Sequence, residues 1–591
     1  MGKMRIRSTS RKKMSLMGID GSLWADSSRR WRDGDVEGVP NIADSISFFR
    51  LNIFYVCVVF VLLVFLARLF VLTIVAGDKN RQLAEGNRIR LVEVEAERGQ
   101  IFDRYGRVLA ISETYFVLKK GDSEREITFD EAQKLEDQGL AGEYFIGDEG
   151  KIERRVRRKY ALGEAAAHVL GYTSVVQEEE RANQVDLALT NARGRLGIEA
   201  SYDQFLTGRV GKRLIEIDAV GSNVAVLGEK ESVRGRNIHT TLDGDLQRVA
   251  YEALRKYARD SQSNRGAIVI ANPNTGEVLG LVSFPSFDPM DIGRSVSNQD
   301  NPFFNRAVLG SYPPGSVFKI NSALAGLESG QVDANWEVDD VGRFELGGQI
   351  FSNWYFNQYG KTDGLIKMER AIKRSNDVYF YRLGEKVGLD TLRQMAIKLG
   401  FGQKTGIDLP SEALGLVPDG VWKRVAIGDE WYLGDTMHLA IGQGYMLTTP
   451  VQVMGMTSYV ASGKLTKPFI VNKIESGLDA SEISIGLKIG GEGLAREDSL
   501  NLVRAGMVGA CESGGTGAPF FRADYKIACK TGTAEEAGGK PHAWFTVYGP
   551  VGNPQIVMTV LVERGGEGSA VAAPVAKEVF DWWMVNRVNT R

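Results

Sequence analysis

Cysteine and histidine are scarce in this chain of 591 residues, and their scarcity argues against several kinds of site. The three cysteines are Cys57, Cys511 and Cys529, and only four histidines occur. Without a C-x-x-C pair, such a set argues against a disulfide framework and a zinc knuckle. Without an H-E-x-x-H motif, a zinc hydrolase has little support. We expect Cys511 and Cys529 to be small buried side chains, with a bridge between them in an oxidising compartment as the alternative.

A large excess of charge and a high proline content are also missing. The formal net charge of −2 gives no electrostatic reason to bind nucleic acid, so we expect no nucleic-acid partner. Only 16 prolines stand against 68 glycines, which suits a chain with many turns better than a proline-rich linker. The length predicts two or three folded units with tails.

The chain does contain one long hydrophobic run, LNIFYVCVVFVLLVFLARLFVLTIVAG, which extends from Leu51 to Gly77. Its first part alone approaches the ~20 residues that a membrane-spanning helix needs. A signal peptide would have an apolar region of only ~7–15 residues, much nearer the start of the chain. We therefore predict an uncleaved transmembrane anchor over residues 51–76.

The residues before this run are basic at first and then polar. The residues before Asp20 include no acidic residue. They include six basic residues: Lys3, Arg5, Arg7, Arg11, Lys12 and Lys13. We predict that residues 1–50 form a largely disordered cytoplasmic tail. Because basic flanks stay on the cytoplasmic side, this predicts a single-pass protein of the cytoplasmic (inner) membrane. Its N-terminus would lie inside, and everything after Gly77 would lie on the outer, periplasmic side.

Arg68 interrupts the hydrophobic run and has two interpretations. Its side chain either reaches the outer headgroups while Leu69–Val75 extend the helix, or it faces a polar group on a membrane partner. Unchanged complex formation by an Arg68→Leu variant would eliminate the second interpretation.

The chain after the anchor divides into a charged region and a region with stronger patterns. Over residues 78–235, short strand-like runs such as RLVEVEA alternate with turn signals such as DRYG, and no cluster indicates catalysis. We predict an elongated, mixed, non-catalytic pedestal domain there. From residue 236 onward, GAIVIANPNTGEVLGLVSF predicts two strands joined by a turn, and HAWFTVYGP and QIVMTVLVE predict a second strand pair.

The remaining patterns of this second region are helical. Helical periodicity occurs around Lys319–Leu327 and Met368–Leu383, and VAKEVFDWWMVNR predicts a closing helix. Strands at both ends with helices between them predict an α/β (α+β) domain over residues 236–591. Its antiparallel sheet would join both ends of the region, with helices at its flanks.

The stretch SYPPGSVFKINSALAGLESG holds the first chemically informative motif. Two prolines and a glycine can introduce a helix, so Ser316 would lie in its first turn, where free N–H groups favour developing negative charge. Lys319 lies three residues later, and its amine can return to the same face as the hydroxyl. A serine needs an adjacent base, and burial can lower a lysine pKa enough to supply one. A second S-x-x-K, Ser10–Lys13, belongs to the basic tail.

A second cationic motif follows the apolar run KIAC. On an edge strand, Gly532 would let a peptide approach closely, and Lys530 would attract a substrate carboxylate. Thr531 and Thr533 would offer hydroxyls. The similar stretch 404–406, in the loop FGQKTGIDLP, lacks this strand context, and we expect it to be structural.

The third motif is Ser375-Asn376-Asp377, within AIKRSNDVYFYRLG. Helical surroundings would let Ser375 point inward as a proton shuttle, while the third position holds a substrate amide. His542 is another candidate for a catalytic base, but the sequence shows no acid placed to orient it. We expect His542 to be structural or to line the substrate site.

Together, the order S-x-x-K, S-x-D, K-T-G resembles the penicillin-recognising serine enzymes. From about Arg88 to Phe580, the chain is similar to the class B penicillin-binding proteins, the monofunctional transpeptidases of peptidoglycan synthesis. The similarity includes RGQIFDRYGRVLA, AAAHVLGY and GRLGIEASYDQFLTG in the pedestal region, which we expect to be structural. In the catalytic region it includes PPGSVFK, GDTMHLAIGQGYMLTTPVQ and CKTGTAE.

This resemblance implies a role for each motif residue. Ser316 would attack the penultimate D-Ala carbonyl of a stem peptide ending in D-Ala-D-Ala, and Lys319 would take its proton. The acyl group would then pass to an amine of a neighbouring stem, whereas β-lactams would trap Ser316 as a long-lived ester. Ser375 and Lys530 would relay protons, Thr531, Gly532 and Thr533 would hold the substrate, and the N–H groups of Ser316 and Thr533 would form the oxyanion hole.

Two departures from the common pattern matter. The third residue of the second motif is Asp377 rather than asparagine, which resembles the elongation-type branch, often called penicillin-binding protein 2. It also leaves open whether Asn376 or Asp377 holds the substrate amide. Some elongation-type relatives bind zinc near this helix, but residues 335–375 contain no cysteine or histidine. We therefore expect neither a metal nor another cofactor; stoichiometric zinc in purified protein would overturn this expectation.

Partners and alternatives follow from the same resemblance. The region before the catalytic domain lacks the length and motifs of a glycosyltransferase domain, which implies a separate multipass membrane glycosyltransferase within a cell-wall synthesis complex. A division-type, septal transpeptidase is the nearest alternative. A β-lactamase or D,D-carboxypeptidase, with water as the acceptor, is an enzymatic rival. A non-catalytic scaffold or penicillin sensor is the rival of another class.

Overall fold

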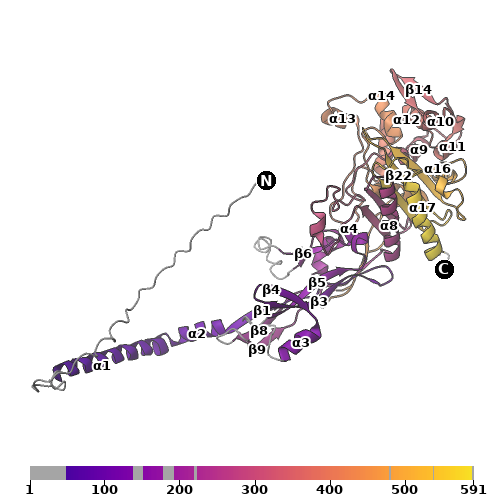
Figure 1. Cartoon of the computed structure of the whole chain (residues 1–591). Helices are drawn as coiled ribbons and strands as arrows, with labels where there is room; N and C mark the ends of the chain where they lie inside the picture. The colour runs from indigo at the N-terminus through magenta and orange to yellow at the C-terminus, as the bar shows by residue number, and fades with distance from the viewer. Residues whose placement is uncertain are drawn as a thin grey trace, which may run out of the picture. The chain divides into compact units, whose positions relative to one another are not determined.

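The computed structural model describes residues 48–137, 151–176, 192–217, 223–477, 481–536 and 538–588 (Figure 1). Apart from its last three residues, the predicted cytoplasmic tail lies outside the described residues. The chain divides into two compact units, residues 1–85 and 86–591.

The first unit contains the predicted anchor. Helix α1 (Phe48–Phe70) continues through a π-helical turn (Val71–Val75), and the stretch Leu51–Val75 is long and apolar enough to cross a membrane. No part of this stretch is buried within the described protein. Since a helix that is apolar on all faces needs apolar surroundings, a bilayer is the environment that suits it. Helix α2 (Gly77–Arg88) follows and was not predicted from the sequence.

The pedestal region contributes two sheets to the second unit. The smaller one has the order β1-β8-β9, with strands Ile89–Val94, Gly211–Ile217 and Asn223–Lys230. The larger one has the order β19-β18-β10-β2-β3-β4, with β5 paired to β3. Its strands are β2 (Ile101–Phe102), β3 (Val108–Lys120), β4 (Ser123–Ile127), β5 (Lys151–Tyr160), β10 (Ile238–Thr240), β18 (Val471–Ile474) and β19 (Ile483–Ser484). Strands from both predicted domains therefore share one sheet.

Shorter elements complete the pedestal region. They are α3 (Phe129–Asp137), η3 (Gly163–Ala166), α4 (Ala167–Leu170), β6 (Thr173–Val175), β7 (Ala192–Gly194), α6 (Gly197–Ser201) and α7 (Asp203–Leu206). Strands β6 and β7 pair with each other.

A buried ion cluster joins two of the pedestal motifs, those that contain Arg98 and Glu199. Glu199, from the GRLGIEAS motif, is fully buried and accepts hydrogen bonds from Arg98 Nε at 2.5 Å and from Arg158 Nε at 2.7 Å. Burial alone would raise the pKa of Glu199, but the two guanidinium groups hold that pKa below its usual value. Removal of one partner from such a cluster costs about 3–5 kcal/mol because an unpaired charge stays buried.

The catalytic region is built on a five-stranded antiparallel sheet with the order β12-β11-β23-β22-β21. Its strands are β11 (Gly266–Ala271), β12 (Val278–Phe284), β21 (Ala528–Ala534), β22 (His542–Gly549) and β23 (Ile556–Val562). The two predicted strand pairs and the predicted joining of both ends of the region are confirmed. Strand β21, which carries the K-T-G motif, lies at the edge as predicted.

Helices cover both faces of this sheet. Successive residues of β11 point to opposite faces, so each face presents buried apolar side chains to the helices on that side. Ile268 and Ile270 pack with α8 (Gly244–Asp260) and the closing helix α17 (Ala572–Trp583), which lie side by side (Figure 1). Ala267 and Val269 pack in the other core with α9 (Lys319–Glu328) and α15 (Pro450–Ser462).

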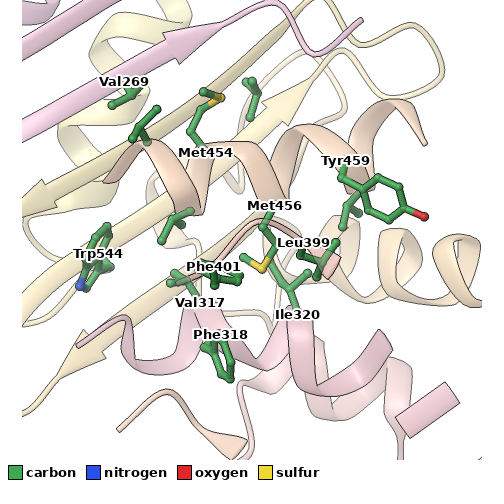
Figure 2. Close-up of a cluster of buried hydrophobic side chains, with 14 of the residues drawn as sticks. Val269, Val317, Phe318, Ile320, Leu399, Phe401, Met454, Met456, Tyr459 and Trp544 are labelled. Atoms are coloured by element: carbon green, nitrogen blue, oxygen red, sulfur yellow. The ribbon is translucent and has the colours of Figure 1, made fainter. Parts of the chain in front are cut away.

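The second of these cores fixes the predicted nucleophile turn. Figure 2 shows Val317, Phe318 and Ile320 beside side chains from α15 and the sheet, among them Met456 and Trp544. Val317, Phe318 and Ile320 are all fully buried. Burying one such side chain contributes about 1.5–3 kcal/mol, so the residues around Ser316 are held by packing rather than by the turn alone.

The other elements of the catalytic region surround this core. Paired strands are β13 (Glu337–Asp340) with β16 (Gly364–Lys367), β14 (Arg343–Leu346) with β15 (Gln349–Ser352), and β17 (Lys464–Thr466) with β20 (Ile489–Glu492). The further helices are η5 (Ile292–Ser295), η6 (Gly315–Phe318), α10 (Trp354–Tyr359), α11 (Met368–Arg374), α12 (Asp377–Lys398), α13 (Gly420–Ala426), α14 (Leu433–Ala440), α16 (Glu497–Ala510), η7 (Ala518–Phe520) and η8 (Met584–Val588).

Cys511 and Cys529 form a disulfide with a Cα–Cα distance of 5.8 Å. Both side chains are buried, as expected, and the bridged alternative is the one that the structure shows. The bridge connects the residue after α16 to strand β21, one position before Lys530.

Candidate active site

Ser316 lies in a 3-10 turn that leads directly into α9, so its predicted position at the start of a helix is confirmed. The residue before it, Gly315, has φ +57°, and a Cβ there would lie 2.6 Å from the carbonyl oxygen of Thr533. Only glycine combines this backbone conformation with such a close approach. Ser316 is half-buried, whereas Val317 and Lys319 are buried.

Lys319 is fully buried, and its amine is directed at the S-x-D motif. Nζ donates to Asp377 Oδ1 at 2.6 Å, to the carbonyl oxygen of Ser375 at 2.8 Å and to Ser375 Oγ at 3.4 Å. Within the described structure, no hydrogen bond joins Lys319 Nζ to Ser316 Oγ. Catalytic hydrogen bonds are often long before substrate binds, so this geometry does not remove Lys319 as a base.

Lys530 also contacts Ser375. Its Nζ donates to Ser375 Oγ at 2.7 Å and to the carbonyl oxygen of Thr531 at 3.0 Å, and the side chain is fully buried. Two lysine amines from distant parts of the chain therefore meet at one hydroxyl. Such convergence is what a proton relay requires.

The two amines do not hold their protons equally well. Burial lowers the pKa of Lys319, but the carboxylate of Asp377 opposes this change. Burial lowers the pKa of Lys530 well below its ordinary value of 10.5, and the charge of Lys319 lowers it further. With one carboxylate for two amines, Lys530 loses its proton more readily than Lys319 does.

The Ser375–Asp377 segment interrupts what the sequence presents as one helical stretch. Ser375 has φ +52° and ends α11, while Asn376 is the N-cap of α12. The Asn376 side chain is fully buried, accepts from the N–H of Tyr379 at 2.9 Å and donates to Asp340 Oδ2 at 2.7 Å. Its amide is therefore committed to the fold, whereas Asp377 contacts Lys319.

The K-T-G strand packs directly against the nucleophile turn. A Cβ on Gly532 would lie 2.9 Å from Trp544 Cβ and 3.0 Å from Val317 Cγ1. The structure thus adds a packing reason for glycine at this position. Its missing side chain makes room for Trp544 and Val317. The predicted role of Gly532 in letting a substrate peptide approach stays a prediction.

The hydroxyl groups of the K-T-G strand contact other parts of the chain. Thr531 Oγ1 donates to Thr516 Oγ1 at 2.8 Å, and Thr533 Oγ1 donates to Glu567 Oε2 at 2.9 Å. Sequence patterns gave no signal for Thr516 or Glu567, which lie outside regular elements.

His542 takes no part in this arrangement. Its Nδ1 accepts from the N–H of Arg564 at 3.1 Å, and its ring packs edge-on against Tyr312 with 5.5 Å between ring centres. Burial lowers the pKa of His542. No sequence signal placed an acid beside His542, but Glu536 Oε2 lies 3.5 Å from its Nε2. The contacts fit the first of the two roles expected from the sequence, a structural role or a place in the lining of the substrate site.

The region near the S-x-D motif does not fit a zinc ion. In the described part of the chain, no three His, Cys, Asp or Glu side chains gather as metal ligands. The nearby carboxylate of Asp363 pairs with Arg374 at 3.0 Å, and that of Asp340 accepts amide hydrogen bonds. The expected absence of a metal stays a prediction.

Comparisons with known proteins cover nearly the whole chain. Residues 266–581 match the family model described as penicillin binding protein transpeptidase domain, and residues 124–240 match the one described as penicillin-binding protein dimerisation domain. Peptidoglycan D,D-transpeptidase MrdA of Acinetobacter baumannii is 33% identical over 628 residues, covering 94% of this chain and 89% of the relative.

Solved structures agree with this result. A penicillin-binding protein (PBP2) in complex with MreC, from Helicobacter pylori, matches with a TM-score of 0.71 and 26% identity, covering 85% of this chain and 100% of that one. A chain from work on polymerization and crosslinking by a peptidoglycan synthase complex matches with a TM-score of 0.72 and 28% identity, covering 91% and 99%. Because the transpeptidase model spans more than half of the chain and its relatives match almost end to end, this chain belongs to the class B penicillin-binding proteins, in the elongation-type branch of MrdA and PBP2.

Proposed function

We propose that this chain is a serine peptidoglycan D,D-transpeptidase of cell elongation, with Ser316 as its nucleophile. The observation that carries the proposal is the meeting of two buried lysine amines at Ser375, next to the turn that holds Ser316. The substrates are stem peptides ending in D-Ala-D-Ala, and β-lactams are mimics of them.

In the first half of the reaction, Ser316 Oγ bonds to the penultimate D-Ala carbonyl carbon and loses its proton to an amine. The C–N bond to the terminal D-Ala then breaks, and the leaving amine takes a proton. Lys319 is the nearer base in sequence, while Lys530 is the amine with the more strongly lowered pKa. Ser375 connects both and would carry the proton between them.

In the second half, an amine of a neighbouring stem attacks the Ser316 ester, loses a proton to the relay and forms the cross-link. The N–H groups of Ser316 and Thr533 would stabilise the oxyanion in both halves. The close approach of Gly315 to the Thr533 carbonyl supports this pairing, because it brings the two backbone segments together.

The K-T-G strand would hold the donor peptide. Its position at the sheet edge allows a peptide to add as a further strand, and Thr531 and Thr533 would bind the terminal carboxylate. Of the two candidates for the amide-holding group, the commitment of Asn376 to capping favours Asp377.

The placement of the whole protein follows from its anchor and its relatives. We propose a single-pass inner-membrane protein with a cytoplasmic N-terminus and a periplasmic catalytic domain. We also keep the domain limits 51–76, 78–235 and 236–591. The family-model match at 266–581 lies inside the last of these domains, and the match at 124–240 begins within the pedestal and ends just past residue 235. Because similar chains were solved with MreC and in a peptidoglycan synthase complex, we propose a cell-wall synthesis complex with a multipass glycosyltransferase as its partner.

The test is a donor–acceptor assay with the full-length protein in detergent. A pentapeptide ending in D-Ala-D-Ala is supplied with an amine acceptor, and mass spectrometry follows free D-Ala and the new amide. We expect both products from the wild type and neither from Ser316→Ala. Free D-Ala without the amide would indicate a carboxypeptidase, and no product from folded wild type would favour the scaffold or sensor.

A further inference from the structure

Asp340, at the end of β13, is a buried carboxylate at the centre of a hydrogen-bond network outside the proposed catalytic residues. It is 1% exposed. Its Oδ1 accepts from the N–H of Gly342 at 2.9 Å. Its Oδ2 accepts three hydrogen bonds, from Asn353 Nδ2 at 2.8 Å, the N–H of Asp363 at 3.0 Å and Asn376 Nδ2 at 2.7 Å. In the described structure, no lysine or arginine forms an ion pair with it.

These donors come from segments that are separate in the sequence. Asn353 precedes α10, Asp363 precedes β16, and Asn376 caps α12. One carboxylate oxygen therefore connects these three segments. Hydrogen bonds to an ionised acceptor are stronger than neutral ones, and buried donors that lose their partner are destabilising.

The network continues from Asp340 to the catalytic amine. Asn353 Oδ1 accepts from the N–H of Asp377 at 3.2 Å, and the N–H of Trp354 donates to Asp377 Oδ2 at 3.0 Å. Asp377 Oδ1 then holds Lys319 Nζ at 2.6 Å. The orientation of the Asp377 carboxylate thus depends on Asn353 and its neighbour, which Asp340 fixes.

Asp340 also fixes the other side of the same turn. Its bond to Asn376 holds the residue between Ser375 and Asp377, both of which contact Lys319. Since Ser375 has a left-handed backbone conformation, its loop needs support from outside to keep that geometry.

We infer that Asp340 is a positioning residue for the acylation step. It acts through Asn353 and Asn376, holds the Ser375–Asp377 turn around the amine of Lys319, and touches no substrate. This inference rests on the proposed function, because acylation of Ser316 is its readout. Among the described residues, no hydrogen bond or ion pair joins Asp340 to the K-T-G strand, so the non-covalent binding of a β-lactam should not depend on it.

The test compares Asp340→Asn with Asp339→Asn in full-length protein, using a fluorescent penicillin. Asp339 is exposed on the same strand and serves as the matched control. For Asp340→Asn we expect the acylation rate constant to fall by about 100-fold, with an unchanged non-covalent dissociation constant and a full final yield of adduct. Asp339→Asn should match the wild type.

A double-variant cycle separates positioning from a merely structural role. Asn353→Ala should slow the same step, and its combination with Asp340→Asn should slow acylation by much less than the product of the single effects, because both act along one path. A wild-type rate constant in folded Asp340→Asn would overturn the inference, as would a cycle in which the two effects multiply. A wild-type protein that forms no adduct would instead contradict the proposed function.

Discussion

At the scale of single residues, the site is defined by an imbalance of charge. Two lysine amines lie near one carboxylate, that of Asp377, and of the two only Lys319 is hydrogen-bonded to it. The hydroxyl of Ser375 lies between the two amines, 3.4 Å from one and 2.7 Å from the other. A neutral amine in this position can accept a proton from serine, and a fully charged pair could not.

This imbalance predicts a pH-dependent stability for Lys530→Met. An unfolded lysine titrates near ~10.4, whereas burial and the charge of Lys319 hold the pKa of folded Lys530 well below that. Between the two pKa values the unfolded state binds the extra proton, so wild-type stability rises with pH. The variant lacks this gain. Its free energy of unfolding relative to the wild type should therefore decrease as the pH rises between the two pKa values, an interval that ends near ~10.4, by up to about 1.4 kcal/mol per pH unit.

Urea unfolding at several pH values measures this difference. Lys526→Met, which removes an exposed lysine just before the same strand, should show no such trend. A difference between Lys530→Met and wild type that is independent of pH would contradict the assignment of Lys530 as the amine with the strongly lowered pKa.

A second residue-scale prediction concerns Glu567. Its carboxylate accepts a hydrogen bond from the Thr533 hydroxyl. In the proposed function, the same hydroxyl binds the carboxylate of the substrate. The negative charge of Glu567 repels the negative carboxylate of penicillin, and two unit charges about 4 Å apart in water repel by about 1 kcal/mol. Glu567→Gln removes this repulsion, so acylation by penicillin should become about five-fold faster. The gain should shrink with added salt. Glu536→Gln, whose carboxylate pairs with Arg564, is the control, and unchanged acylation by Glu567→Gln would contradict the prediction.

At the scale of elements, strand β21 matters most, because it carries the K-T-G motif at a sheet edge and is tied to the end of α16 by Cys511–Cys529. A disulfide that closes a loop of this size, with a sequence separation of 18, stabilises a protein by about 3 kcal/mol. The paired substitution Cys511→Ala and Cys529→Ala should lower Tm, and reductant should lower the wild-type Tm towards the same value.

Calorimetry with and without reductant measures this effect, and Cys57→Ser is the control because Cys57 is a free cysteine on α1. A wild-type Tm that does not respond to complete reduction would contradict a stabilising role for the bridge.

Some features of the helices and strands could be predicted from sequence patterns, and others could not. The strand pairs, the closing helix and the edge position of the K-T-G strand follow from local alternation and turn residues, and the structure confirms them. The break at Ser375 does not, because a left-handed residue between two helices leaves the apolar periodicity on both sides intact. The direction of the Lys319 amine was also missed, since it depends on Asp377, which lies in a different helix.

At the scale of the whole molecule, long-range pairing limits prediction. Strands β18 and β19 join the sheet of β2 and β3 from far along the chain, and no local pattern selects their partner. The Asp340 network likewise joins loops whose individual residues look like ordinary turn formers. The chemistry of the site could be predicted because each of its three motifs is a short continuous segment. The hydrogen bonds that hold these motifs in place could not, because they form only in the complete fold.

The central claim is that Ser316 is an acylating nucleophile. The most direct measurement is intact mass and peptide mapping of the full-length protein after incubation with a fluorescent penicillin, followed over time. We predict one adduct per chain, on Ser316, that persists for hours and is absent from Ser316→Ala. Rapid loss of the adduct would indicate hydrolysis, as in a β-lactamase. No adduct on folded wild-type protein, or an equal adduct on Ser316→Ala, would contradict the account.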